Sequence, residues 1–391
     1  MVLTSFIKIV KLFAREYRDL RALLQARNKS MRTLTFYAEG ALFYQYYESV
    51  IEVILQMSSL DICYITSDPH DPIFHHPNKH VHAFYIDRLL VAALSRLDST
   101  VLVMTMTDLE TYNVKRSQNV AEYVYLFHAM ISTHLVYREV AFDYYDTIFC
   151  VGPHHVQEIR KAETMRALPQ KNLLEIGYPR LEKIYRDHRA FIQKRSHKER
   201  SFQKTILIAP TWGPHVILTT CIAELIALLA ETEYRVLIRP HPEFIKRNGS
   251  AIKKIIALTQ TTLNIQLEQN LLSDASLHEA DVLITDHSGI AFEYAFGTER
   301  PVLFIDTPLK IRNPVYQRLS IEPMEITLRN IVGVSVSPRD IVRLPSMLHN
   351  LLNQQEQFAE RIRNHREKYV FHWMNAARGA AQALMTRCRQ G

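Results

Sequence analysis

Residues that can bind phosphate or move protons follow several apolar runs of this 391-residue sequence. In Asp281–Asp306 (DVLITDHSGIAFEYAFGTERPVLFID), an apolar run ends in Thr285, Asp286 and Ser288. A helical pattern begins directly after Gly289, which gives a ligand close access to the backbone. Because the first N–H groups of a helix lack partners within it and carry partial positive charge, the segment predicts a phosphate site. An ordinary helix cap formed by Ser288 is the alternative.

Tyr234–Pro242 (YRVLIRPHP) repeats this arrangement of an apolar run that ends in polar side chains. Arg239 suits bidentate phosphate contact, and His241 suits proton transfer near neutral pH. A rigid turn made by the prolines is the alternative. Glu293 lies five residues after Ser288, so its carboxylate is expected near the same helix N-terminus, where it can accept hydrogen bonds from a ribose.

The first half of the chain offers a second histidine. Tyr125–Met130 (YLFHAM) places His128 at the end of an apolar run, so His128 and His241 form a candidate proton-transfer pair with one member from each half. A buried core histidine is the alternative for His128. Two weaker candidate donor-binding residues are Thr211 in Ile206–Trp212 (ILIAPTW) and Arg180 in Ile176–Arg180 (IGYPR).

Parallel strands must position these motifs, and the order of the apolar runs predicts two sheets. Strand-like runs alternate with helical patterns before and after a charged stretch at Arg186–Lys204, which we interpret as the interdomain connection. We expect two doubly wound α/β domains facing a cleft, over residues 33–195 and 204–391, the second with a helical tail. The expected strands are residues 32–38, 61–66, 100–104, 123–127, 147–151, 205–209, 234–238, 282–285 and 302–305.

The positive charge is concentrated at the N-terminus. Residues 1–32 hold eight basic and two acidic residues, a net charge of +6 out of +7 for the chain. Their apolar side chains recur three and four apart, which predicts a basic amphipathic helix. Three interpretations remain open: a helix on an anionic membrane surface, a helix packed on the protein's own core, and a short coiled-coil seam. Nucleic acid is not an expected partner, because the rest of the chain is almost neutral.

Composition excludes several classes of protein. The four cysteines are far apart and form no CxxC pair, which argues against a disulfide framework or a cysteine zinc site and fits a reducing cytoplasm. No apolar run is long enough to span a bilayer, and basic residues interrupt the N-terminus where a signal peptide would be apolar. The histidines of Pro69–His82 match no familiar zinc spacing, so we expect a polar surface loop there and no metal site.

In order, the motifs APTW, RPHP, ADVLITDHSGIAFEYA and RPVLFID resemble those of the CDP-glycerol glycerophosphotransferase family of teichoic-acid and capsule polymerases. The GYPR turn is similar to the family's GxPRxD element, with Glu182 at the acidic position. The resemblance implies a GT-B-like fold, with an acceptor domain before a nucleotide-donor domain, and transfer without a metal or cofactor. It also implies a cytoplasmic protein attached peripherally to the inner face of the cell membrane.

The family's catalytic histidines would fall on His128 and His241, its phosphate-binding serine on Ser288 and its ribose-binding acid on Glu293. Three departures stand out. The family's WHG becomes FHAM, its tyrosine–serine pair becomes His287 and Ser288, and an arginine usual after the tryptophan of APTW is missing. We expect Arg180 or Arg239 to supply that phosphate contact if the protein makes it.

The resemblance implies transfer of a polyol phosphate, such as glycerol phosphate, from a CDP-activated donor to a hydroxyl of a polyol-phosphate or glycan acceptor. His128 would act as general base, while His241 would contact the β-phosphate or protonate the leaving group. The alternative is a GT-B glycosyltransferase or a UDP-GlcNAc 2-epimerase-like enzyme that uses a nucleotide sugar. A third hypothesis is a nucleotide-binding scaffold without chemistry, since the altered WHG motif leaves the acceptor pocket in doubt.

Overall fold

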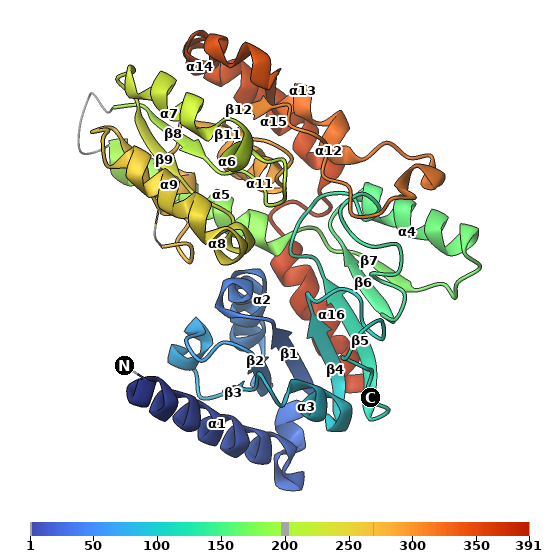
Figure 1. Cartoon of the computed structure of the whole chain (residues 1–391). Helices are drawn as coiled ribbons and strands as arrows, with labels where there is room; N and C mark the ends of the chain where they lie inside the picture. The colour runs from blue at the N-terminus through green and yellow to red at the C-terminus, as the bar shows by residue number, and fades with distance from the viewer. Residues whose placement is uncertain (1, 197–202, 269, 391) are drawn as a thin grey trace. The chain divides into compact units, whose positions relative to one another are not determined.

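The computed structural model describes residues 2–196, 203–268 and 270–390, which divide by their contacts into two units. Unit 1 contains residues up to 128, residues 137–180 and residues from 370 onward. Unit 2 contains residues 129–136 and 181–369. Each unit is built around its own parallel sheet (Figure 1).

Unit 1 has seven parallel strands in the order β3-β2-β1-β4-β5-β6-β7. Its central strands are continuous apolar runs because both faces are covered by helices; β1 and β2, for example, are buried at all five positions. The elements of unit 1 are α1 (Val2–Leu24), β1 (Leu34–Ala38), α2 (Tyr44–Met57), β2 (Ile62–Thr66), β3 (Val81–Tyr85), α3 (Leu90–Arg96), β4 (Ser99–Met104), β5 (Val120–Leu126), β6 (Thr147–Cys150), α4 (Pro153–Met165), β7 (Asn172–Glu175) and α16 (Ala376–Gln390).

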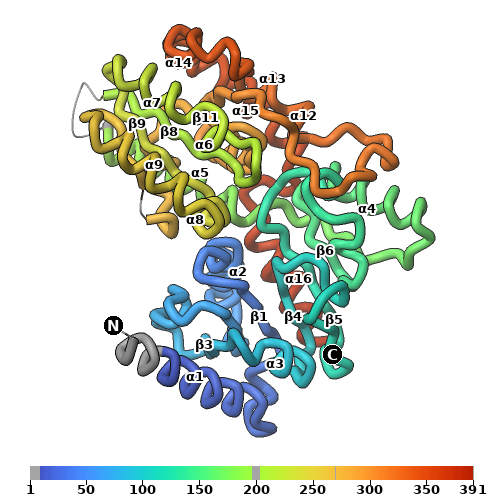
Figure 2. The backbone as a smooth tube through the Cα atoms, in the orientation of Figure 1, coloured from blue at the N-terminus to red at the C-terminus, as the bar shows by residue number. Residues whose placement is uncertain are grey.

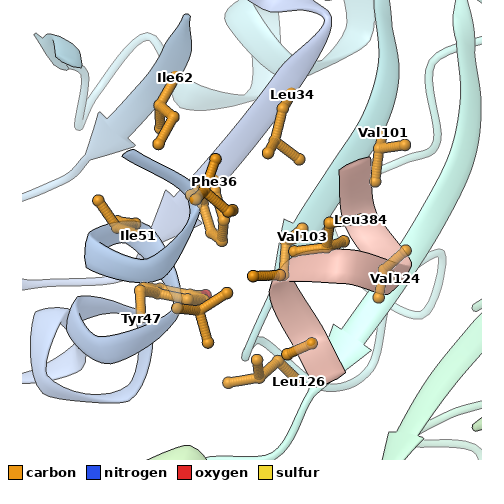
Figure 3. Packing of buried hydrophobic residues seen from close by; sticks show 14 of the residues in the cluster. Leu34, Phe36, Tyr47, Ile51, Ile62, Val101, Val103, Val124, Leu126 and Leu384 are labelled. Carbon is orange, nitrogen blue, oxygen red and sulfur yellow. The ribbon is translucent and has the colours of Figure 1, made fainter. Parts of the chain in front are cut away.

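The C-terminal helix α16 completes the core of unit 1. Its alanine-rich face packs beside α2 on the central strands, with Leu384 among the side chains of β4 and β5 (Figure 3). Small side chains let the helix lie close to the sheet. The chain approaches Gly177 closely at this point: a Cβ there would lie 2.2 Å from the carbonyl oxygen of Phe371, and φ of Gly177 is +93°, a conformation that favours glycine.

Unit 2 has six parallel strands in the order β10-β9-β8-β11-β12-β13. Its elements are α5 (Pro179–Ser196, which begins in unit 1), β8 (Thr205–Ile208), α6 (Ile217–Thr220), α7 (Ile222–Ala230), β9 (Arg235–Ile238), α8 (Pro242–Arg247), α9 (Gly249–Thr259), β10 (Ile265–Leu267), α10 (Ala275–Glu279), β11 (Val282–Thr285), α11 (Ile290–Thr298), β12 (Val302–Ile305), α12 (Met324–Thr327), α13 (Arg329–Val332), β13 (Gly333–Val336), α14 (Leu344–Asn353) and α15 (Gln355–Tyr369).

The predicted fold class, two doubly wound parallel α/β sheets, is confirmed. The division of the chain differs from the expected boundaries in three places. The stretch expected to connect the domains continues α5 of unit 2 as far as residue 196, and residues 197–202 lie outside the described part. The end of the helical tail, from residue 370, joins unit 1 rather than unit 2. Residues 129–136 join unit 2, held there for example by the hydrogen bond from Ser132 N to Glu325 Oε2 (3.0 Å).

The N-terminal helix α1 lies along β3 and α3 of unit 1 (Figure 2). Charged side chains make several of its contacts: Glu16 is buried and accepts hydrogen bonds from the backbone N–H groups of Asp87 and Leu89, and Arg15 lies over the ring of Phe74. One face of α1 therefore packs on the protein itself, as the second of the three interpretations predicted. Among the described residues, no helix combines the length and apolar character needed to cross a membrane.

Candidate active site

The loops after the strands of unit 2 carry most of the residues predicted from the sequence. Thr211 follows β8, His241 follows β9 and Ser288 follows β11. From the neighbouring strands β8 and β11 the sheet extends in opposite directions, so their carboxyl ends form a topological switch point. Open α/β sheets bind ligands at such points. The fold thus gathers these three residues at one edge of one sheet.

Asp286 and Thr285 position the loops at this edge. Asp286 is fully buried and accepts hydrogen bonds of 2.8–3.1 Å from the backbone N–H groups of Thr211, Ile217 and His287. The hydroxyl of Thr285 donates to the carbonyl oxygen directly after β8 at 2.7 Å. These bonds join the loop after β8 to the loop after β11. Both side chains make these bonds within the protein, and their predicted contact with the donor remains a prediction.

The N-terminus of α11 differs from an ordinary capped helix. Gly289 is its N-cap residue and no side chain caps it, so the alternative of a Ser288 cap does not apply. In the described part of the chain the Ser288 hydroxyl has no hydrogen-bond partner. Gly289 has an ordinary φ of −61°, and a Cβ there would make only an ordinary contact with Ile131 at 3.4 Å, so close access of a ligand at Gly289 remains a prediction. Glu293 lies buried in the first turn of α11.

His241 is the N-cap residue of α8, and this role fixes its tautomer. Its Nδ1 accepts a hydrogen bond from the backbone N–H of Glu243 at 3.1 Å. A neutral imidazole whose Nδ1 is an acceptor carries its proton on Nε2. His241 therefore presents Nε2–H, which can donate a hydrogen bond to a phosphate oxygen.

Arg239 uses its guanidinium for hydrogen bonds within unit 2. Its Nη1 donates to Glu268 Oε1 (3.1 Å), Ser273 O (2.6 Å) and Ser276 Oγ (3.1 Å), and its Nη2 donates to Leu271 O (2.8 Å). The arginine thus holds the loop after β10 in place. Phosphate binding by Arg239 remains a prediction that these bonds do not favour.

Lys310, which the sequence analysis missed, lies at the same edge in the loop after β12. Its Nζ donates to Thr211 Oγ1 at 3.1 Å and lies 4.2 Å from the centroid of the Trp212 ring. Burial, and to a lesser degree the nearby Arg312 guanidinium, lowers the pKa of Lys310 to about 8. The signal was present in the sequence as DTPLK, a polar segment that follows an apolar strand.

A second missed group, Arg329, ties the loops after β11 and β12 together. Its Nη1 donates to the carbonyl oxygen of Asp286 at 3.0 Å, and its Nη2 pairs with Asp306 at 2.5 Å. His287 donates from Nε2 to Thr307 O at 2.8 Å, and burial lowers its pKa. His287 is therefore a neutral positioning residue.

His128 follows β5 in unit 1, and its tautomer is the opposite of that of His241. Its Nδ1 lies 3.1 Å from the carbonyl oxygen of Thr105; a carbonyl can only accept, so Nδ1 carries the proton. Nε2 then holds a lone pair. The rings of Phe43, Tyr46 and Tyr137 surround the imidazole at centroid distances of 5.9–6.0 Å. Burial lowers the pKa of His128 to about 4, so the ring is a neutral base at pH 7.

Arg180 lies in the first turn of α5, directly after the Gly177 turn, and its side chain is buried. It belongs to unit 1, whereas Thr211 and Ser288 belong to unit 2. A donor contact from Arg180 remains a prediction.

A family model described as CDP-glycerol:poly(glycerophosphate) glycerophosphotransferase matches residues 56–312. The chain belongs to this family of transferases. It is 29% identical, over 171 residues, to the teichoic acid glycerol-phosphate primase of Bacillus subtilis (strain 168), covering 40% of each chain. The curated relatives are matched over 40% and 56% of their own lengths, so the chain spans about half of them.

Two solved structures share the fold. The wall teichoic acid polymerase TagF matches with a TM-score of 0.62 at 14% identity, over 99% of this chain and 98% of that one. The UDP-GlcNAc 2-epimerase of Neisseria meningitidis matches with a TM-score of 0.61 at 13% identity, over 90% of this chain and 99% of that one. At these identities both likenesses concern the fold alone. Family membership, in contrast, agrees with the resemblance carried by the motifs.

Proposed function

We propose that this member of the family transfers a polyol phosphate from a CDP-activated donor to an acceptor hydroxyl, in the synthesis of a teichoic-acid- or capsule-like polymer. Family membership supports the reaction class. The single observation that carries the division of roles is the opposite tautomers of the two histidines. His128 has a lone pair on Nε2 and can act as a base, whereas His241 has a proton on Nε2 and can act as a hydrogen-bond donor.

In the proposed step, Nε2 of His128 takes the proton of the acceptor hydroxyl as its oxygen attacks the β-phosphorus of the donor. A bond forms between that oxygen and the phosphorus, and the bond from the phosphorus to the bridging oxygen breaks. CMP leaves with the electron pair of the broken bond. His241 hydrogen-bonds to the diphosphate through Nε2–H and so stabilises the charge that develops on the departing CMP.

The donor would be bound by unit 2. The N–H groups at the start of α11 and the Ser288 hydroxyl would hold the diphosphate. Positioning and charge stabilisation supply much of the rate in phosphoryl transfer. Glu293 would accept hydrogen bonds from the ribose. The ribose role rests on the resemblance to the family and on the position of Glu293 in the first turn of α11.

We further propose that α1 holds the protein on the anionic cytoplasmic face of the cell membrane. Because charged residues of α1 face unit 1, Val10, Phe13 and Tyr17 are left 51%, 47% and 54% exposed. Lys11, Arg18 and Arg21 are exposed on the same helix. An exposed apolar stripe flanked by basic residues is typical of helices that lie in a membrane interface.

A donor screen tests the proposed reaction. The protein is incubated with an acceptor and, separately, CDP-glycerol, CDP-ribitol or UDP-GlcNAc, and the released nucleotide is identified. CMP release from a CDP-polyol is expected. Release of UDP, or epimerisation of UDP-GlcNAc without release, would establish the nucleotide-sugar alternative, and no turnover with any donor would favour a scaffold.

A further inference from the structure

The ammonium group of Lys310 connects two loops that are distant in the sequence. Its loop follows β12, yet its hydrogen bond reaches Thr211 in the loop after β8. The ring of Trp212 lies under the ammonium group at a distance typical of a cation–π interaction. Lys310 therefore places a positive charge beside the tryptophan after which the family's usual arginine is missing.

The charge of Lys310 is not balanced by a close carboxylate. In the described part of the chain, its ammonium makes no ion pair within 4.0 Å; its contacts are the Thr211 hydroxyl and the Trp212 ring. Arg247 also lies over Trp212, at 5.0 Å, but Glu243 pairs with it at 2.8 Å. A partly buried ammonium without a counter-ion is costly, and an anionic ligand would remove that cost.

We propose that Lys310 is the missing cation of the donor site and binds the diphosphate of the activated donor together with Thr211. The proposal rests on the proposed function for the identity of the donor and adds a residue to its site. Trp212 acts as a positioning residue, since its ring holds the lysine in place. Thr211 keeps its predicted role at the donor, because Asp286 fixes its backbone while Lys310 binds its hydroxyl.

Proton uptake offers a readout that a structural lysine would not give. The charged groups that act on Lys310 are Arg312, which opposes its protonation, and Asp286 and Glu243, which favour it. With a pKa of about 8, roughly half of Lys310 is neutral at pH 8. A bound diphosphate raises the pKa, so donor binding at pH 8 should take up about half a proton per site.

Calorimetric titration with CDP-glycerol in two buffers of different ionisation enthalpy measures affinity and proton uptake together. Lys310→Met is expected to raise the dissociation constant roughly ten- to hundredfold and to abolish proton uptake. Lys310→Arg should keep most of the affinity but lose the uptake, because arginine is always protonated. Lys254→Met, which removes an exposed lysine on α9, is the matched control and should change neither quantity.

Unchanged affinity in Lys310→Met, or uptake that persists in Lys310→Arg, would overturn the proposal for Lys310 and leave the proposed reaction standing. If the parent protein binds UDP-GlcNAc but no CDP-polyol, the proposed reaction fails instead. The same variants titrated with UDP-GlcNAc then decide whether Lys310 binds a diphosphate. Melting curves of both variants show whether a loss of affinity is caused by unfolding. If Lys310→Met unfolds, Lys310→Arg still tests the proposal through its affinity and its loss of proton uptake.

Discussion

The Nδ1 atom of His128 lies 3.1 Å from the carbonyl oxygen of Thr105, and this contact leaves Nε2 of the ring as the basic atom. At His241 the backbone N–H of Glu243 donates to Nδ1, so the proton of this ring is on Nε2. Backbone groups thus set opposite tautomers in the two histidines.

Replacing His128 by asparagine should abolish most turnover without weakening donor binding. The asparagine amide can still donate to Thr105 but cannot accept a proton, and loss of a positioned base typically costs roughly 10²- to 10⁴-fold. Turnover and calorimetric donor affinity are measured on the same preparation. His82→Asn, which removes a histidine that contacts Asp61 in the same unit, is the control. Normal turnover in His128→Asn would refute its role as base.

The pH profile should reflect the lowered pKa of His128. The base works only when neutral, so activity is expected to persist as the pH falls from 7.5 to 5.5 and to be lost as the pH approaches about 4. An imidazole with an ordinary pKa of about 6.5 would already be mostly protonated at pH 5.5. NMR titration of the His128 ring measures the pKa directly. A midpoint near 6.5 would contradict this account.

His241→Asn should weaken donor binding and turnover while the protein keeps its stability. Asparagine is a good N-cap residue, so α8 retains a side-chain acceptor for the N–H of Glu243 but loses Nε2–H. His241→Ala loses the cap as well, which costs about 1 kcal/mol. Calorimetry and melting curves of the two variants separate the roles. If only the alanine variant binds donor weakly, the role of His241 is structural.

Ser288→Ala should raise the donor dissociation constant and leave the melting temperature almost unchanged. The Ser288 hydroxyl makes no hydrogen bond within the described residues, so its removal costs the folded protein little. A lost hydrogen bond to a charged ligand costs about 1.5–3 kcal/mol. Thr285→Val is the matched comparison, because its hydroxyl bonds within the protein and its loss should lower stability instead. A Ser288→Ala variant that melts much lower but binds donor normally would contradict the prediction.

Membrane binding should depend on the exposed stripe of α1. Phe13→Ser with Tyr17→Ser is expected to reduce sedimentation with anionic vesicles without lowering the melting temperature, since both side chains are about half exposed. Binding of the parent should weaken with salt, because the Debye length falls from about 10 Å at 0.1 M to about 3 Å at 1 M. Val91→Ser, similarly exposed on α3, is the control. Point variants are preferable to deletion of residues 1–32, since Leu23 and Arg32 are buried. Unchanged vesicle binding would exclude α1 as the membrane contact.

All nine strands predicted from the sequence are present within a few residues, and the four strands that were missed lie at the edges of the two sheets. β3 and β7 flank the first sheet, and β10 and β13 flank the second. Edge strands are covered on fewer sides, so they are only partly buried; β7, for example, has no buried residue. Their sequences therefore lack the continuous apolar runs that mark central strands.

The remaining differences arise from contacts between residues distant in the sequence. Arg239 and Lys310 both follow an apolar strand in the sequence, so local pattern does not distinguish them. In the structure Glu268 pairs with Arg239, whereas no close carboxylate pairs with Lys310 in the described part of the chain. In the same way, the alanine face of α16 is a local feature, whereas its packing on unit 1 depends on the whole fold. The sequence therefore predicted which residues follow the strands better than which partners their side chains bind within the protein.

The most direct test of the proposed reaction is mass spectrometry of the acceptor after incubation with CDP-glycerol, with nucleotide products quantified in the same reaction. The account predicts that each acceptor hydroxyl that reacts gains one glycerol phosphate and that CMP is released in equal amount. Transfer of glycerol without phosphate, release of CDP, or CMP release without modification of the acceptor would contradict it.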